Sequence, residues 1–499
     1  MRTSTSSLVS VALALPALTG ATICKNFVDS ERLQELIKLE DLLAGSRKLQ
    51  ELADAHGGNR AFGSGGHNAT VDFVYDTLTA LNYYNVTKQP FTELFSYGTG
   101  KLIVGGEAVE ANIMTYTASG TLVDTPIILA PGLGCTPEEF PATVAGNIAL
   151  VQRGSCTFAA KAGSAKTAGA AGLIVYNNVP GSLSGTLGGV GNYAPVVGIS
   201  LEAGQAILAD LEAGPVTGSL DINAIVEQRV NYNVIAETKG GDHDNVLVLG
   251  GHSDSVGAGP GINDDGSGSI GILRVAEALS KFKVKNAVRF AWWGAEEFGL
   301  LGSRYYVNQL NGSATELARM RAYLNFDMIA SPNYVNGIYD GDGSAFGLVG
   351  PAGSDAIEKE FEKFYDSKGA KHVPSAFSGR SDYAAFIENG VPAGGIFTGA
   401  EVLKTEAEAA LFGGQAGVAY DKNYHTARDT YDNLNHEAYL TNSKAIAHTV
   451  ATYALSFDSL APVNLSKRRY DAARAQFTRR GSHGHAGEHS GPCGGGDTI

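Results

Sequence analysis

Acidic residues and a histidine follow three short apolar runs in the middle of the chain. Residues 246–249 precede His252, residues 288–292 precede Glu296 and Glu297, and residues 322–326 precede Asp327. Apolar runs that alternate with helical patterns are typical of buried strands in a mostly parallel sheet. In such sheets, ligands bind at the carboxyl ends of the strands. We therefore expect these side chains to form one site, able to hold two metal ions for hydrolysis.

The pair His252 and Asp254 is separated by one residue. An extended backbone sends both side chains to the same side, so Asp254 is expected to accept a hydrogen bond from the ring N–H of a metal-bound His252 and to fix its tautomer. Asp264 follows a glycine-rich loop and is expected to bridge two cations with its two oxygens. Its neighbour Asp265 is expected to cap a helix over 267–280.

Glu296 and Glu297 are adjacent carboxylates, expected to point apart. One can then hold a metal ion while the other acts as a base on water, a division of roles that hydrolysis needs. Taken alone, Glu-Glu after a strand is more often a solvated acidic turn. The neighbouring histidine and aspartates favour the site.

Two other kinds of chemistry are excluded. Residues 266–271 match the dinucleotide pattern G-x-G-x-x-G, but a true fingerprint turns directly off its strand, and about 15 residues intervene here after Gly250. The chain also lacks the G-x-S-x-G pattern of serine hydrolases.

Five separated motifs resemble one known family. They are GGHSDSV, GINDDGSGS, WWGAEEFGLLGS, NFDMI and NYHTARDTYDN. They resemble the di-zinc peptidase family of aminopeptidase Y, secreted leucyl aminopeptidases and glutamate carboxypeptidase II, over residues 30–95 and 230–460. The segment GNIALVQRGSCTFAAKAGSAKTAGAAGLIVYNN looks like the protease-associated domain of such peptidases. The whole arrangement is most similar to fungal leucine aminopeptidases.

The resemblance implies an α/β fold, with a mostly parallel central sheet flanked by helices (a zinc-peptidase, phosphorylase/hydrolase-like fold) and an inserted β-rich protease-associated domain. It also implies two Zn²⁺ per chain, with ligands at His252, Asp264, Glu297, Asp327 and His425. Glu296 falls at the family's general base. Tyr424 matches a tyrosine that some members use on the oxyanion, and Arg380 matches a loop that lines the substrate site.

The function implied is that of a zinc aminopeptidase, which hydrolyses the N-terminal peptide bond and favours leucine or other apolar residues. None of the five metal positions is substituted, which argues against a degenerate relative. A carboxypeptidase or dipeptidase of the same family is one alternative, although Arg380 is the only Lys or Arg between Val373 and Ala400. A non-catalytic binding or sorting protein that uses the inserted domain is another.

The 499 residues divide into four parts. Residues 1–20 are expected to be a signal peptide, because Arg2 precedes an apolar run over 8–18 and small residues follow. Residues 21–100 and 227–460 are expected to form the catalytic domain and residues 101–226 the insert, a spacer or substrate gate rather than a binding module. Residues 468–499, rich in Gly, Ser and His, are expected to be disordered. We expect a secreted protein, with vacuolar delivery as the less favoured alternative.

A formal net charge of -14 argues against nucleic acid and anionic membranes as partners, and no later apolar run is long enough to span a bilayer. The expected partners are peptide substrates, and the expected state is a monomer. In a secreted protein, the four sequons at Asn68, Asn85, Asn311 and Asn464 are expected to be N-glycosylation sites.

Four cysteines fit an oxidising compartment. Cys135 and Cys156 are the natural pair, and their bond would close a loop of about 20 residues and stabilise the fold by roughly 3 kcal/mol. Cys24 and Cys493 can pair with each other, or Cys493 can stay free. Four cysteines allow three pairings, so the sequence leaves the choice open.

Overall fold

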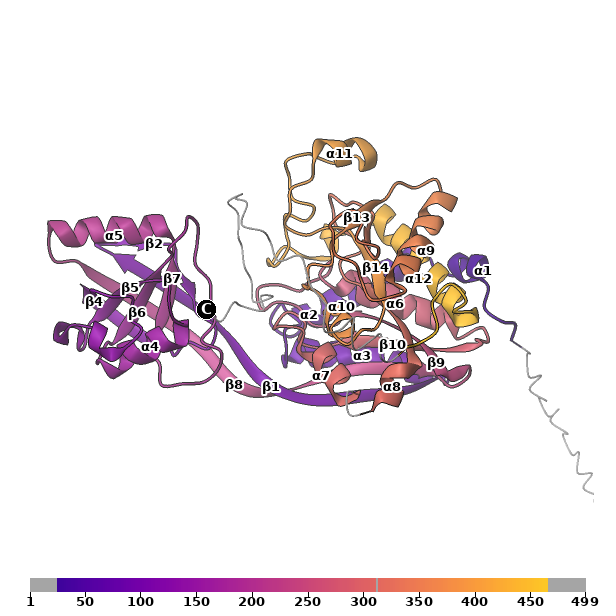
Figure 1. Cartoon of the computed structure of the whole chain (residues 1–499), viewed down its shortest axis with the longest axis horizontal. Coiled ribbons are helices and arrows are strands. Elements are labelled where there is room, and N and C mark those ends of the chain that lie inside the picture. Colours follow the sequence, from indigo (N-terminus) through magenta and orange to yellow (C-terminus); the bar gives the residue numbers. More distant parts are fainter. Residues whose placement is uncertain (1–24, 311–312, 465–499) are drawn as a thin grey trace, which may run out of the picture.

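The computed structural model describes residues 25–310 and 313–464. The expected signal peptide, the expected tail over 468–499, Cys24, Cys493 and Asn311 lie outside the described residues. The described chain forms two lobes joined by a long two-stranded ribbon (Figure 1). The larger lobe contains the residues of the expected site, and the smaller lobe is the insert.

Four parallel strands form the centre of the larger lobe's sheet, in the order β14, β11, β9, β10. Antiparallel strands flank them, because β8 pairs with β10 and β12 pairs with β14. The predicted α/β class with a large central sheet is thus confirmed, with antiparallel pairing at its flanks. The strands of this lobe are β9 (Asp242–His252), β10 (Asn286–Trp293), β11 (Met320–Phe326), β12 (Gly337–Tyr339), β13 (Val373–Ser375) and β14 (Ala393–Phe397).

Helices cover both faces of this sheet. Along β9, Leu247 and Leu249 pack into one hydrophobic core, while Val246 and Val248 pack into another, because successive strand residues point to opposite faces. Burial on both faces explains why the run is apolar throughout. One face carries α1 (Ser30–Glu35), α2 (Leu39–Asp54), α3 (Gly65–Ala80), α6 (Gly266–Leu279), α9 (Ser354–Ser367) and α12 (His436–Leu455); the other carries α7 (Leu301–Leu310), α8 (Ala314–Arg319) and α10 (Tyr383–Ile387).

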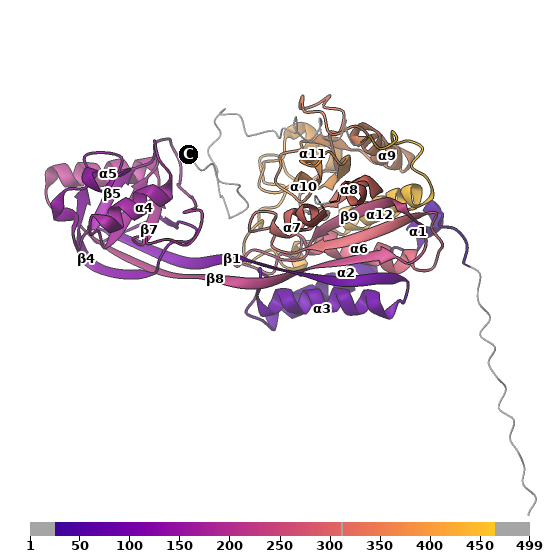
Figure 2. The same ribbon diagram turned by 60° about the horizontal axis from the view of Figure 1, so that its bottom comes forward.

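Local conformation sets the ends of the first three helices. The helical pattern over 30–55 forms two helices, α1 and α2, because Lys38 takes an extended conformation between them. Helix α3 begins at Gly65, because the Ser64 side chain accepts a hydrogen bond from the His67 backbone and caps the helix there. Figure 2 shows α2 and α3 together along one side of the larger lobe. Helix α11 (Glu406–Phe412) stands apart from the sheet in Figure 1.

The ribbon that reaches the insert consists of β1 (Tyr84–Val104) and β8 (Thr217–Thr238). They pair antiparallel over their whole length, from Tyr84 opposite Thr238 to Val104 opposite Gly218. The predicted boundaries at 100/101 and 226/227 therefore fall inside two continuous strands (Figures 1 and 2).

The insert has two small hydrophobic cores of its own. Its Ala-rich helix ends at Thr167, because Gly169 takes a φ of 89°, a left-handed conformation that ends a helix. The elements of the insert are β2 (Glu107–Val109), β3 (Asn112–Ile113), β4 (Gly120–Leu129), β5 (Ile148–Gln152), α4 (Phe158–Thr167), β6 (Gly172–Tyr176), β7 (Val196–Ile199) and α5 (Leu201–Ala213).

Cys135 and Cys156 form a disulfide inside the insert. Three of the sequon asparagines, Asn68, Asn85 and Asn464, are exposed. Among the described residues, no helix combines the length and apolar character needed to cross a membrane.

Arg60 is a fully buried arginine that ties the N-terminal segment to the loop after β9. Its guanidinium donates hydrogen bonds to the carbonyl oxygens of Ser253, Pro260 and Gly261. Its backbone also pairs with Ser255. Four buried aspartates attract its charge: Asp254, Asp264, Asp265 and Asp429. Arg60 therefore acts as both a clamp for this loop and a counter-charge beneath the expected site.

We expect Arg60→Met to lower the free energy of unfolding by about 3 kcal/mol or more, because it leaves buried carbonyl groups and carboxylates without their partner. Both tryptophans, Trp292 and Trp293, lie buried in β10, so their fluorescence during urea unfolding reports on this lobe alone. The control is Arg47→Met, which removes an exposed arginine from α2. Equal stability of the two variants would contradict the clamp.

Candidate metal centre

The carboxyl ends of β9, β10 and β11 meet at one edge of the sheet. Trp293 lies opposite His252, and Asn325 lies opposite Gly250. His252 is the last residue of β9, the Glu296–Glu297 pair follows β10, and Asp327 follows β11. The parallel register therefore brings together side chains that are far apart in the sequence.

Asp264 lies between the two histidines of the site. Its Oδ1 is 3.1 Å from His252 Nε2, and its Oδ2 is 3.1 Å from His425 Nε2. The loop that carries it is held in place because the backbone N–H groups of Asn263 and Asp264 donate to the Asp429 carboxylate at 2.9 and 3.0 Å. One carboxylate thus reaches both imidazoles, as a bridging ligand must.

The other two expected ligands complete two groups around Asp264. Asp327 Oδ1 lies 3.6 Å from His252 Nε2, and Glu297 Oε2 lies 2.9 Å from His425 Nε2. The structure therefore brings all five expected ligands together. The candidate ligand atoms of His252, Asp264 and Glu297 all lie within 4.8 Å of one another.

The buried carboxylates of this cluster require positive charge. Burial raises the pKa of Glu297, and the neighbouring Asp264 carboxylate adds to the shift. Burial lowers the pKa of His425, but the Glu297 and Asp264 carboxylates reverse that effect and raise it to about 10. Each imidazole nitrogen faces carboxylate oxygens, so either a proton or a metal ion must lie between them. Imidazole and carboxylate are ligands that zinc takes, and the donor set fits that metal.

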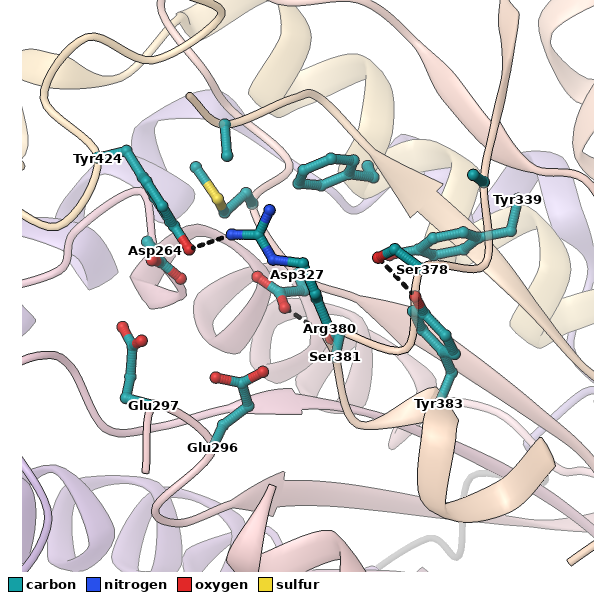
Figure 3. A pocket seen from close by; sticks show the side chains of 14 residues that line it. Asp264, Glu296, Glu297, Asp327, Tyr339, Ser378, Arg380, Ser381, Tyr383 and Tyr424 are labelled. Atoms are coloured by element: carbon teal, nitrogen blue, oxygen red, sulfur yellow. Dashed lines mark hydrogen bonds between the residues drawn. The ribbon is translucent and has the colours of Figure 1, made fainter. Parts of the chain in front are cut away.

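Glu296 and Glu297 do not point apart as predicted. Both carboxylates line the same pocket (Figure 3). The reason is that the chain leaves the extended conformation at Ala295, which has a φ of 58°, so the alternation of a strand no longer applies. Glu296 Oε2 is 3.9 Å from His252 Nε2, farther than the nearest carboxylate oxygens of the expected ligands. Burial raises the pKa of Glu296 well above its usual value.

Asp254 contacts His252 in a way that differs from the prediction. The nearest acceptor to His252 Nδ1 is the backbone oxygen of Asp254 at 3.2 Å, while the carboxylate oxygen Oδ1 is 3.7 Å away. That Oδ1 instead accepts a hydrogen bond from the backbone N–H of Glu296 at 3.1 Å. Asp254 therefore fixes both the histidine and the turn that carries the two glutamates.

Asp265 caps α6 through Gly268, as predicted. Its carboxylate also accepts hydrogen bonds from the backbone N–H groups of His252 and Met328, both at 3.0 Å. One side chain thus joins the ends of β9 and β11 to the start of the helix. Those two longer-range contacts carry no signal in the sequence.

Sequence reasoning missed Ser381, whose hydroxyl donates to Asp327 Oδ2 at 2.6 Å. The side chain of Asn325 donates a hydrogen bond to the same hydroxyl at 2.8 Å, so Asn325 and Ser381 together fix the position of the Asp327 carboxylate. The only signal was its position next to Arg380, in a segment already assigned to the substrate site. Its role as a support for Asp327 depends on a contact between residues 54 positions apart.

Arg380 and Tyr424 lie together at the rim of the pocket (Figure 3). The guanidinium of Arg380 donates to the Tyr424 hydroxyl oxygen at 3.2 Å and pairs with Glu401 at 2.7 Å. The Glu401 carboxylate therefore compensates the charge of Arg380. The Tyr424 ring stacks on that of His425, with ring centres 3.7 Å apart.

One wall of the pocket is apolar. The acids line one side, and aliphatic and aromatic side chains line the other (Figure 3). The apolar wall is formed by Met328, Tyr339, Ala376, Tyr383, Phe397 and Ala400. The pocket therefore joins a cluster of metal-ligand side chains to a surface suited to an apolar group.

Comparison with known proteins places both lobes in families. Residues 233–450 match Peptidase family M28, and residues 118–207 match the PA domain. The chain is 54% identical to a probable leucine aminopeptidase 2 of Aspergillus fumigatus, over 91% of each chain. It is 50% identical to leucine aminopeptidase 2 of Arthroderma otae, over 96% of this chain and 98% of the relative.

Solved structures agree with these relatives. An aminopeptidase from Aneurinibacillus sp. strain AM-1 superposes with a TM-score of 0.64 and 27% identity, over 88% of this chain and 97% of the other. A zinc aminopeptidase from Bacillus subtilis superposes with a TM-score of 0.60 and 25% identity, over 83% of this chain and 94% of the other. With the clustered ligands, these likenesses establish that the chain belongs to peptidase family M28, as a metallo-aminopeptidase with an inserted PA domain.

Proposed function

We propose that this protein is a secreted aminopeptidase that uses two zinc ions and favours leucine or other apolar N-terminal residues. The observation that carries the proposal is the position of Asp264, which lies 3.1 Å from each of two histidines. Asp327 completes one group of ligands and Glu297 the other.

His252, Asp264 and Asp327 would hold one zinc, and Asp264, Glu297 and His425 the other. A bound zinc pair lowers the pKa of a water molecule and polarises the scissile carbonyl. The carboxylate side chains of this cluster have little exposed surface, so bulk water has little access to the space between them.

Glu296 is the proposed general base. It takes a proton from the attacking water and delivers that proton to the leaving amine. Burial raises the pKa of Glu296 above its usual value, which is the direction in which enzymes shift a glutamate that acts as a general base. The Asp254 carboxylate accepts a hydrogen bond from the backbone N–H of Glu296, which keeps the Glu296 carboxylate directed into the pocket.

Tyr424 is the proposed donor to the oxyanion that forms on the substrate carbonyl. A hydroxyl that accepts one hydrogen bond can still donate its own hydrogen, and the Tyr424 oxygen accepts from Arg380. Arg380 thereby orients the hydroxyl, and its own pairing with Glu401 argues against a grip on a substrate carboxylate. This supports cleavage at the amino end rather than the carboxyl end.

The apolar wall formed by Met328, Phe397 and their neighbours supports a preference for leucine-like side chains. Secretion is supported by the signal-like N-terminus, by the Cys135–Cys156 disulfide and by the exposed sequons at Asn68, Asn85 and Asn464. We also infer a monomer, because one chain supplies every proposed ligand.

We expect Glu296→Gln to retain zinc and to lower kcat on leucine p-nitroanilide by about 10²–10⁴, the usual contribution of a general base. Metal analysis and steady-state kinetics measure the two effects. The control is Glu51→Gln, which changes an exposed glutamate of α2. Undiminished turnover in the Glu296 variant would remove this residue from the mechanism.

We expect His425→Ala to lower the bound zinc from two equivalents to about one, because the second site then loses a nitrogen ligand. Metal analysis after dialysis measures the stoichiometry. His436→Ala changes an exposed histidine at the start of α12 and should keep both equivalents. Two equivalents in both variants would contradict the ligand assignment.

We expect acetylation of the substrate's α-amine to abolish hydrolysis, and leucine p-nitroanilide to be cleaved faster than the glutamate analogue. An aminopeptidase must recognise the free amine, and the apolar wall gives no partner to a side-chain carboxylate. Rates on the three substrates, with and without a chelator, test both points. Equal cleavage of the acetylated p-nitroanilide would instead support an endopeptidase, and cleavage of an acetylated peptide with a free carboxyl terminus would support a carboxypeptidase.

A further inference from the structure

A second cluster of carboxylates lies next in sequence to Tyr339, one of the residues that line the pocket. Its members are Asp340, Asp342 and Glu358, each of which offers one oxygen within 4.8 Å of the others. Asp340 and Glu358 are buried, and Asp342 is exposed. Two residues come from the loop after β12, and Glu358 comes from α9.

The backbone of the loop uses only part of this oxygen set. Asp340 Oδ2 accepts from the N–H groups of Ala345 and Phe346, at 3.1 and 2.8 Å. Glu358 Oε2 accepts from those of Gly341 and Asp342, at 2.9 and 3.1 Å. Each buried carboxylate therefore has one oxygen that the main chain fixes in place.

Asp340 Oδ1 is the strongest sign of a missing partner. This atom is buried on a side chain that is only 1% exposed, and it has no hydrogen-bond partner among the described residues. A buried carboxylate oxygen without a partner is costly. Lys359, which pairs with Asp355 at 3.7 Å, attracts the Asp342 carboxylate. The side chains of Asp340 and Asp342 also lie within hydrogen-bond contact of each other, a contact that two ionised carboxylates cannot make without a proton or a cation between them.

The three negative charges also act on one another. Burial raises the pKa of Glu358 to about 7, and the charges of Asp342 and Asp340 contribute to the rise. A cation between the carboxylates would remove both the repulsion among them and the cost of the unpartnered oxygen, since it supplies positive charge and is coordinated by Asp340 Oδ1.

We propose that Asp340, Asp342 and Glu358 bind one divalent cation of the Ca²⁺ class, separate from the zinc pair. Carboxylate oxygens alone suit hard cations such as Ca²⁺, whereas zinc sites in proteins usually contain nitrogen or sulfur ligands. Asp340 and Asp342 are spaced as the first two acids of calcium-binding loops, although Ala345 and Pro351 stand where those loops have a glycine and a glutamate. Glu358 of α9 supplies the third carboxylate from outside the loop.

The site would strengthen the wall of the substrate pocket. The backbone N–H of Asp340 donates to the Ser375 carbonyl at 2.8 Å, which joins the loop to β13. Tyr339, the preceding residue, lines the pocket and stacks on Phe377 with ring centres 5.1 Å apart. A cation held by Asp340 would therefore fix the position of Tyr339 without touching the reacting groups.

The test is calcium titration of the zinc-loaded enzyme, desalted into calcium-free buffer with zinc kept saturating. We expect isothermal titration with CaCl₂ to give one saturable site with a Kd between about 10⁻⁶ and 10⁻³ M. Calcium at 100 times that Kd should raise the thermal midpoint by about 5 °C. Terbium should bind in place of calcium and emit light sensitised by the nearby Tyr339.

Two variants locate the site. Asp342→Asn alters an exposed side chain and Glu358→Gln a buried one, and each should weaken calcium binding by about tenfold or more through the loss of ligand charge. The matched control is Asp366→Asn, on the exposed end of α9, which should bind as the wild type does. Zinc content and circular dichroism verify that the variants are folded.

The proposal is overturned if the wild-type enzyme shows no saturable calcium binding at 10 times the upper Kd, or if a folded Asp342→Asn variant binds calcium unchanged. An equal loss in the Asp366→Asn control would also overturn it, because the binding would then be a property of the acidic surface. Each readout is independent of peptidase activity, so the result does not depend on the proposed zinc chemistry.

Discussion

Repulsion among buried carboxylates is the constraint on which this site depends. Asp264, Glu296, Glu297 and Asp327 are gathered at one edge of the sheet with little exposed surface. Such a group is stable only when positive charge lies among the oxygens. His252 and His425 would provide nitrogen ligands for a metal ion that carries that charge, and the buried guanidinium of Arg60 supplies a further positive charge at the loop. The candidate ligand set and the buried arginine therefore form one electrostatic unit.

The sheet explains how distant segments meet at the site. Parallel strands place their carboxyl ends side by side, so three short turns contribute ligands without long excursions of the chain. Asp265 then joins two of those strand ends to α6 through three backbone N–H groups. Rigid strands and a capped helix position the ligands more accurately than free loops would.

The strands and several side chains of the site could be predicted because local sequence carries their signal. Apolar runs marked β9, β10 and β11, and an acid or histidine after each run marked the site, whereas His425 was indicated only by the family resemblance. The direction of Glu297 could not be predicted, because it depends on the left-handed conformation of Ala295, a conformation that alanine rarely adopts. Arg60 and Ser381 were missed for another reason: their partners lie about 200 and 54 positions away, and only the folded chain brings them together. The break between α1 and α2 shows the same limit, since no proline or glycine marks it.

The ribbon made by β1 and β8 has a consequence for how the two lobes can be separated. The insert lies at the tip of what is otherwise a β-hairpin of the larger lobe, so segments can be added or removed there without disturbing the strand pairs near β10. A shortened protein would need only a tight turn that joins the two strands in register, such as one between residues paired across the ribbon. Cutting a single strand would not release the insert, because the other strand would still join it covalently to the larger lobe and the hydrogen bonds between β1 and β8 would hold the cut strand in register.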